Sequence, residues 1–334
     1  MDNNGLVSRR GFLAGSAFAG AGALFGLAGC APQTADPLAN TSPEAGSQDS
    51  SDWIGDAPNI SDDEIVETID TEFLVIGAGT GGLFAACAAG DAGMETFVME
   101  KFNGGVVRDD LAGVNSRLQQ ESGYEIDAIA YLRDMDHYAA GQCNLALHKV
   151  WLERSGETID EKTELVDLFL ENSGETIDWY ENVLSSYGIA LWHEAAEEKH
   201  EVNYRHWATG HSPAWPVDGS LDGFTVLTDY AEKTGHVTFR YQTPMVSLTV
   251  ENDRVTGAIG QGADGYIRVN ASKGVLVCTG GYAANLDLLK QLQPHTTSIY
   301  AYNSAQPGCE GDGIKACLRV GAKMDETHSS MLFD

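Results

Sequence analysis

Apolar residues near position 73 occur in short runs separated by a stretch with helical composition. Phe73–Ile76 is a run of four apolar residues, which predicts a short buried parallel strand. Small and apolar residues over Leu83–Ala92 predict a helix, and Thr96–Met99 predicts a second strand. Strands alternating with helices predict an α/β fold built on a parallel sheet.

The next part of the chain has apolar residues at helical spacing. Residues 122–148 and 155–187 both show this spacing, so we predict a helical insertion after the second strand. Within the later stretch, Ser173 followed by Thr176 predicts the start of a helix, because a serine commonly caps the first turn.

From residue 236 the pattern changes to short strands. Turn signals such as Asn252-Asp253 separate these runs, which predicts a small β-meander. An apolar run at 274–278, ending in two glycines, predicts a further strand of the parallel sheet, and 314–320 predicts a helix. The strands expected for the meander are Val237–Tyr241, Met245–Val250, Arg254–Ile259 and Tyr266–Val269.

Glycines follow the first strand at the spacing G-x-G-x-x-G, as Gly77, Gly79 and Gly82. In a dinucleotide site the first permits a tight turn, the second lets a diphosphate approach the backbone, and the third lets helix and strand pack closely. Free N–H groups at the helix start hold the phosphates. Glu100 ends the second strand, near the offset at which a carboxylate binds the adenosine ribose. We predict a dinucleotide site, with an incidental glycine-rich turn as the alternative.

Histidines and tryptophans are concentrated in residues 191–216. Since no H-E-x-x-H or comparable ligand spacing occurs there, we predict no metal site. We interpret the stretch as a loop that covers a planar cofactor or substrate. The six cysteines form no C-x-x-C or C-x-x-C-H motif, so we expect neither a zinc or iron–sulfur site nor covalently attached haem.

The N-terminal residues, 1–30, predict a targeting segment. Ser8–Leu13 resembles the twin-arginine export signal, and Leu27–Cys30, after an apolar run, resembles a bacterial lipobox. We therefore expect export by the twin-arginine route and a lipid on Cys30 that anchors the protein to the outer face of the cytoplasmic membrane. The alternative is an ordinary signal peptide with a chance cysteine. Residues 31–65 are rich in Ser, Pro and Asp, which predicts a flexible linker.

The chain has 334 residues and a formal net charge of −29. A nucleic-acid partner needs a basic face, so this charge argues against one. We interpret the acidic residues as a solvated surface. Contact with a membrane is expected only through the N-terminal lipid or signal.

Several motifs together resemble the fumarate reductase/succinate dehydrogenase flavoprotein family, over residues 73–334. The blocks that carry this resemblance are Val75–Gly82, Glu100-Lys101, Ala112–Asn115, Thr279–Tyr282, and Gly311–Gly313 followed by Gly321-Ala322. The resemblance implies a Rossmann-like FAD-binding fold over 66–334, with a parallel sheet, a helical insertion and a β-meander. It also implies FAD as the cofactor. No histidine matches the one that carries flavin covalently in some members, so we expect non-covalent FAD.

The resemblance implies a set of cofactor-binding residues. The glycine loop would hold the diphosphate, Glu100 the ribose, Ala112–Val114 the isoalloxazine and Val246 the adenine, while the later motifs would complete the flavin pocket. Val106 and the charged residues 108–110 depart from the family pattern, so no flavin contact is assigned over 106–111. The full set is Gly77, Ala78, Gly79, Thr80, Gly81, Gly82, Glu100, Lys101, Ala112, Gly113, Val114, Val246, Thr279, Gly280 and Asp312.

The implied activity is reduction of a conjugated C=C bond in an unsaturated acid or enone by hydride transfer from flavin N5. The partners would be that small-molecule substrate and an extracytoplasmic electron donor of unknown identity. In the family, a substrate-binding histidine motif and a capping domain follow these blocks, and that domain includes the arginine that acts as general acid. We expect both to be missing here, so that the chain is the front half of such an enzyme with no assigned catalytic residue. The alternatives are an FAD-binding or electron-relay lipoprotein without substrate turnover, or an inactive remnant.

Overall fold

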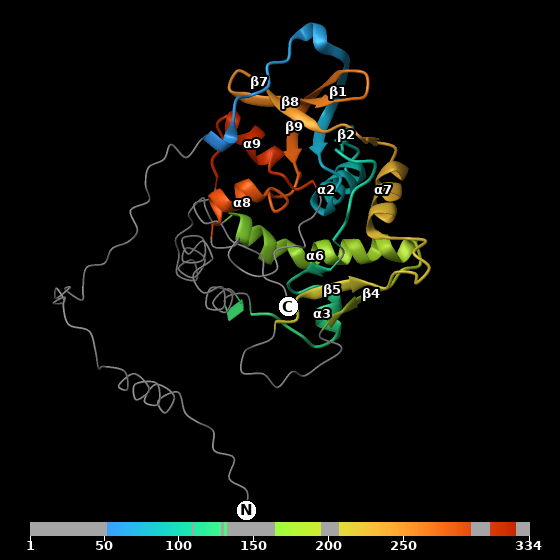
Figure 1. Ribbon diagram of the computed structural model, residues 1–334. Helices are drawn as coiled ribbons and strands as arrows, with labels where there is room; N and C mark the ends of the chain where they lie inside the picture. The colour runs from blue at the N-terminus through green and yellow to red at the C-terminus, as the bar shows by residue number, and fades with distance from the viewer. Residues whose placement is uncertain are drawn as a thin grey trace, which may run out of the picture. The chain divides into compact units, whose positions relative to one another are not determined.

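A six-stranded sheet forms the centre of the described part of the chain (Figure 1), with strand order β6-β2-β1-β9-β8-β7. The structure is a computed structural model that describes residues 52–108, 110–127, 130–131, 164–194, 207–294 and 308–324. The N-terminal segment 1–30 and Cys30 lie outside these residues. The strands are β1 (Ile65–Ile76), β2 (Thr96–Met99), β6 (Val237–Arg240), β7 (Met245–Glu251), β8 (Arg254–Gln261) and β9 (Tyr266–Val277).

One half of this sheet is parallel and the other half antiparallel. Strands β6, β2, β1 and β9 pair in parallel, whereas β7, β8 and β9 pair antiparallel. The predicted meander and the predicted parallel sheet are therefore one sheet, and the α/β expectation is confirmed. Residues 266–269 and 274–277, expected as two strands, belong to the single 12-residue strand β9.

Both faces of the parallel strands are buried, as expected for a parallel sheet. On β1, Val75 faces one apolar cluster while Leu74 and Ile76 face another. The first cluster is formed with α2 (Thr80–Asp91) and α7 (Gly223–Lys233), which pack against each other on the sheet. Truncating a fully buried residue such as Leu74 to alanine would cost about 2–5 kcal/mol.

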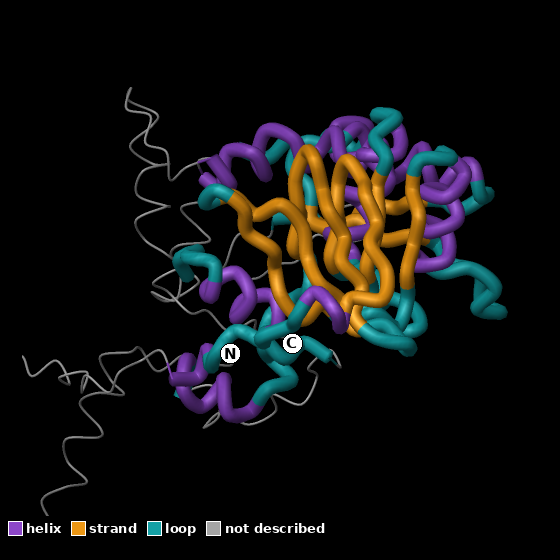
Figure 2. Tube along the Cα trace, turned by 90° about the horizontal axis from the view of Figure 1, so that it is seen from above, coloured by secondary structure: helices purple, strands orange, loops and turns teal. Residues whose placement is uncertain are grey.

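Helix α6 (Glu164–Ser186) crosses the molecule between the main sheet and a second, three-stranded sheet (Figure 1). The second sheet is antiparallel, with order β3-β5-β4. Its strands are β3 (Leu111–Ala112), β4 (Leu191–His193) and β5 (Gly210–Pro213), and α3 (Arg117–Glu121) packs beside it. The view from above places helices along the margins of the main sheet (Figure 2).

Two helix predictions need correction. Ser173 does not begin a helix, because α6 already starts at Glu164 and continues through this position. The stretch 122–127 is not helical, since α3 already ends at Glu121. The described residues 130 and 131 are helical, and the rest of the predicted helix lies outside the described residues. The helix predicted at 314–320 is confirmed as α9 (Asp312–Arg319).

The last part of the predicted linker contacts α9. A 3-10 turn, η1 (Asp52–Ile54), packs against this helix. Arg319 of α9 donates hydrogen bonds to the carbonyl oxygens of Ile54, at 2.7 Å, and Gly55, at 3.3 Å. A second turn, η2 (Asp62–Glu64), leads into β1 at Ile65. Over the described ranges, none of the helices combines the length and hydropathy needed to cross a bilayer.

Candidate cofactor site

The carboxyl ends of three parallel strands bring the predicted glycine loop, Glu100 and Thr279-Gly280 to one edge of the main sheet. The Gly77 N–H donates to the Met99 carbonyl at 2.8 Å, joining the ends of β1 and β2. On the other side, the Cys278 N–H donates to the Ile76 carbonyl at 2.7 Å, joining β9 to β1. This is the edge at which α/β sheets bind their ligands.

Two glycines of the loop are required by close backbone contacts. Gly77 has φ +103°, and a Cβ there would lie 2.4 Å from the Cys278 carbonyl oxygen. A Cβ on Gly82 would lie 1.8 Å from the Gly77 carbonyl oxygen. The roles predicted for these residues, a tight turn and close helix–strand packing, match this geometry.

The beginning of α2 fits the diphosphate of a dinucleotide. Gly79 is the N-cap and offers no side-chain cap to the first N–H groups of the helix. A Cβ on Gly79 would find its nearest neighbour, the Val106 carbonyl oxygen, at 3.8 Å, and one on Gly281 would have nothing within 4 Å. Open backbone, uncapped N–H groups and the positive end of the helix dipole together favour an anion here.

Glu100 supports the glycine loop directly. Its side chain is 7% exposed and accepts hydrogen bonds from the N–H of Ala78 at 2.7 Å and of Phe102 at 2.8 Å. These bonds use both carboxylate oxygens and hold the loops after β1 and β2 together. Sequence reasoning assigned Glu100 only to a ribose and missed this role. The ribose contact stays a prediction.

Lys101 and Asp312, both predicted cofactor residues, contact each other across more than two hundred positions of sequence. The Lys101 Nζ lies 2.8 Å from Glu310 Oε2 and 3.0 Å from Asp312 Oδ2. Partial burial disfavours the charged form of Lys101, but the two carboxylates outweigh this effect, so the pKa of Lys101 is raised. The pairing ties the loop after β2 to the start of α9.

The Thr279-Gly280 loop lies beside the start of α9. The Gly311 N–H donates to the Gly281 carbonyl at 3.1 Å, and a Cβ on Gly313 would lie 2.0 Å from Thr279 Oγ1. The structure therefore brings the Thr279-Gly280 loop and the Gly311–Gly313 motif together, next to the glycine loop.

The segment from Gly105 to Arg108 closes over the glycine loop, a feature that sequence reasoning missed. A Cβ on Gly105 would lie 2.0 Å from the Ala78 carbonyl oxygen. Thr80 Oγ1 accepts a hydrogen bond from the Arg108 N–H at 2.8 Å and donates one to the Arg108 carbonyl at 3.2 Å. Val106, which departs from the family pattern, is 61% exposed.

Val246 is the extra residue of a β-bulge. The pairs Met245–Gly260 and Ser247–Ile259 advance two residues on β7 and one on β8. A bulged residue is released from the regular ladder, which suits a position where backbone meets a ligand. Thr243, three residues earlier, donates its N–H to the Glu100 carbonyl at 2.8 Å, so this strand starts beside the glycine-loop site.

Ala112, Gly113 and Val114 lie apart from the glycine loop, in and next to β3 of the second sheet. The Gly113 N–H donates to the Thr209 carbonyl at 2.9 Å, and the Val114 N–H donates to Ser173 Oγ at 3.0 Å. Residues 101–110 connect the two groups along the chain. The contact of residues 112–114 with the isoalloxazine stays a prediction, and for that predicted role we refer to them as the flavin-facing segment.

Ser173 and Gly174 of α6 explain how the helix approaches the flavin-facing segment. A Cβ on Gly174 would lie 2.5 Å from the Val114 carbonyl oxygen. Sequence reasoning missed this contact, although a glycine inside a helical pattern costs about 1 kcal/mol relative to alanine and so invites a search for a packing reason.

The histidine-rich stretch contains strands where a covering loop was expected. His193 of β4 and His211 of β5 are buried, with ring centroids 4.9 Å apart. His211 donates from Nδ1 to the Thr209 carbonyl at 2.9 Å, and its Nε2 accepts from Ser116 Oγ at 2.7 Å. Burial lowers the pKa of His211, and the neighbouring His193 adds to this effect. No metal-binding cluster of side chains occurs within the described ranges.

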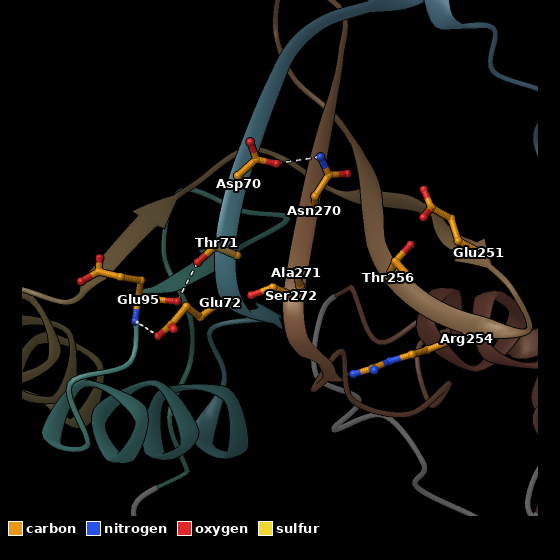
Figure 3. A pocket seen from close by; sticks show the side chains of 10 residues that line it. All are labelled: Asp70, Thr71, Glu72, Glu95, Glu251, Arg254, Thr256, Asn270, Ala271 and Ser272. Carbon is orange, nitrogen blue, oxygen red and sulfur yellow. Dashed lines mark hydrogen bonds between the residues drawn. The ribbon is translucent and has the colours of Figure 1, made fainter.

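A surface pocket of about 690 Å³ lies away from this site. Its lining residues come mainly from β1, β8 and β9, together with Glu95 just before β2. Most of them are polar or acidic (Figure 3). Glu72 and Glu95 line one side, and Arg254 lies on another. The pocket residues of β1 and β9 lie in the middle of these strands, whereas the glycine loop follows the carboxyl end of β1, so the two sites are distinct.

Comparisons with known proteins agree with this geometry. A probable fumarate reductase, Ifc3, of Shewanella frigidimarina (strain NCIMB 400) is 25% identical over 263 residues, which are 77% of this chain and 40% of that protein. The open conformation of a flavocytochrome c3 fumarate reductase superposes with a TM-score of 0.56 at 22% identity, over 80% of this chain and 44% of that one. The 3-ketosteroid-delta4-(5alpha)-dehydrogenase of Rhodococcus jostii RHA1 gives 0.54 at 20% identity, over 79% and 56%.

The chain thus spans less than half the length of the fumarate reductases that it matches. The two structural superpositions, at low identity, support the fold. A family model described as the FAD binding domain matches residues 72–333, and these residues include the glycine loop, Glu100 and both later motifs. The chain belongs to the FAD binding domain family.

Proposed function

We propose that this chain binds FAD and serves in an oxidoreductase that reduces a conjugated C=C bond of an unsaturated acid or enone. The observation that carries the proposal is the glycine loop, with its open backbone and uncapped helix start, braced by Glu100 in a chain of the FAD binding domain family. The similarity to a probable fumarate reductase supports the choice of reaction.

Different residues at the carboxyl edge of the sheet would hold different parts of the cofactor. Gly79–Gly82 would bind the diphosphate, the bulge at Val246 would contact the adenine, and Thr279-Gly280 would contact the flavin end. Bound FAD would supply hydride chemistry at this edge. The protein's contribution would be orientation and exclusion of water.

No proton donor for such a reduction is assigned among the described residues. Arg117 is ion-paired with Glu121 and Glu181, and Arg240 with Glu67, so both guanidinium groups are engaged on the surface. Arg205 lies outside the described residues. None of these arginines is proposed as the proton donor.

Flavin content and turnover test the two halves of the proposal separately. The full chain is purified, its visible absorption is recorded, and it is assayed with a reduced artificial electron donor and a panel of unsaturated acids and enones. Bound flavin with turnover supports the proposal. Bound flavin without turnover of any panel member contradicts the reductase part and favours electron relay. Protein that refolds with added FAD and takes up none contradicts FAD binding.

We further propose that the FAD is non-covalent. Both ring nitrogens of His211, the buried histidine beside the flavin-facing segment, are engaged by Thr209 and Ser116, which supports this proposal. Acid precipitation should release all the flavin into the supernatant. Flavin that stays with the protein pellet would contradict it.

We also propose export by the twin-arginine route and a lipid anchor on Cys30, supported by Arg9-Arg10 and by the lipobox-like Leu27–Cys30. Replacing both arginines with lysine should retain the protein in the cytoplasm. Cys30→Ala should release the exported protein from membranes, measured by fractionation. A Cys30→Ala protein that stays in the membrane fraction would refute the lipid anchor.

A further inference from the structure

Gln119 has a buried side-chain amide that forms hydrogen bonds with the backbone of the flavin-facing segment and of two neighbouring segments. It is 0% exposed. Its Nε2 donates to the Gly113 carbonyl at 2.9 Å and to the Ala208 carbonyl at 2.8 Å. Its Oε1 accepts from the Ser116 N–H at 2.9 Å. One side chain therefore links the flavin-facing segment, the start of α3 and the segment that leads into β5.

The flavin-facing segment receives its other support from α6. The Val114 N–H donates to Ser173 Oγ at 3.0 Å, and the Gly174 backbone lies against the Val114 carbonyl. Gly113 and Val114 are both buried, whereas Ala112 is exposed. The segment is thus held from the protein side by two side chains, Gln119 and Ser173, that come from different helices.

We infer that Gln119 is a positioning residue for the flavin: its amide fixes the flavin-facing segment, against which the isoalloxazine would lie. The inference rests on the proposed binding of FAD. An amide is needed because two donors and one acceptor must be supplied at one buried point, which a carboxylate or an apolar side chain cannot do. Two buried histidines form hydrogen bonds with the same surroundings: His193 Nε2 donates to the Ala208 carbonyl at 2.7 Å, and His211 bonds Ser116 and Thr209.

The test compares Gln119→Glu with Gln120→Glu in the full chain. Both changes add one carboxylate to α3, but Gln120 is exposed and donates only to the Asn115 carbonyl, at 2.9 Å. In Gln119→Glu the carboxylate would face the carbonyls of Gly113 and Ala208. We expect the Kd for FAD to rise about tenfold or more, the effect of breaking a buried hydrogen bond. Gln120→Glu should stay within about twofold of wild type.

The midpoint potential of the bound flavin provides a readout that general destabilisation would not move. A buried carboxylate near the isoalloxazine disfavours the addition of electrons, so the potential of Gln119→Glu should be more negative than that of Gln120→Glu. Lowering the pH should reverse both effects in Gln119→Glu alone, because the protonated carboxyl can again donate to one of the two carbonyls. The titratable groups around this position are His193, His211, Tyr124 and Glu194. Wild type measured at each pH corrects for them.

A second pair of variants keeps the inference testable if Gln119→Glu does not fold. Ser173→Ala removes the acceptor for the Val114 N–H, whereas Ser186→Ala removes a hydroxyl that bonds only within α6. Ser173→Ala should shift the visible spectrum and potential of the flavin, and Ser186→Ala should not. If wild type binds FAD and the two variants of each pair behave alike, this inference is overturned while the proposed function stands. Wild type that binds no FAD overturns the proposed function as well.

Discussion

Replacing Glu100 with glutamine separates two roles of one side chain. In the structure the carboxylate accepts one N–H on each oxygen, from Ala78 and Phe102. An amide of the same shape has one acceptor and one donor, so in either orientation a backbone N–H would face an NH₂ group. The substitution therefore breaks one hydrogen bond, weakens the other and leaves the volume of the side chain unchanged.

The expected cost follows from these two bonds. A hydrogen bond to a charged group is worth about 1.5–3 kcal/mol, and leaving a buried donor without a partner adds to the loss. With Glu100 only 7% exposed, solvent cannot replace the missing acceptor. We expect Glu100→Gln to lower the free energy of unfolding by about 2–4 kcal/mol.

Urea unfolding of the full chain measures this value, with Glu95→Gln as the control. Glu95 lies at the other end of β2, and its side chain is 65% exposed and paired with His236, so its loss should cost less than about 1 kcal/mol. If Glu100 also binds the ribose, FAD affinity should fall in Glu100→Gln and remain normal in Glu95→Gln. A stability change below about 0.5 kcal/mol in Glu100→Gln would refute the bracing role.

Three further results are expected. Gly82→Ala should abolish soluble, FAD-binding protein because its Cβ would lie 1.8 Å from the Gly77 carbonyl oxygen, whereas Gly274→Ala, with open space around the Cβ, should express normally. Unfolding should become easier as the pH falls below about 6.5, since the lowered pKa of His211 lets the unfolded state bind a proton that the folded state does not. His211→Asn should flatten this pH dependence relative to wild type, and an unchanged slope would count against it. Burial and the nearby Asp91 raise the pKa of Cys87 to about 12, so peptide mass spectrometry should find Cys87 unalkylated at pH 8 until the protein unfolds; rapid native labelling would disprove its burial.

The glycine loop could be predicted from sequence because its requirements are local. A turn at φ +103° and a 1.8 Å approach leave few residues other than glycine at Gly77 and Gly82. A four-residue apolar run and a helix of small residues flank the loop on either side. The motif therefore identified both the place and the kind of site.

The supports of the site depend on contacts between distant segments, and a local sequence pattern does not identify the partners. Serine is a common helix-capping residue, yet the hydroxyl of Ser173 accepts a hydrogen bond from the Val114 N–H, 59 positions away. Gln119 follows a serine at capping-box spacing, but its burial depends on Ala208, 89 positions away. The sequence pattern predicts residues 266–269 and the apolar run that begins at 274 as separate strands, while pairing with β1 through Asp70–Asn270 and Thr71–Ala271 continues β9 across the residues between them.

Strand β9 spans 12 residues without interruption, about 40 Å of extended chain. Its first part pairs with β8, whose own partner β7 contains the bulge at Val246, and its last residue precedes the loop at Thr279-Gly280. A single strand thus joins the antiparallel strands β8 and β7 to the parallel part of the sheet, through its pairing with β1. Inserting or deleting one residue within β9 would therefore shift its pairing with β1 and turn every later side chain of the strand to the other face of the sheet, just before the loop at Thr279-Gly280.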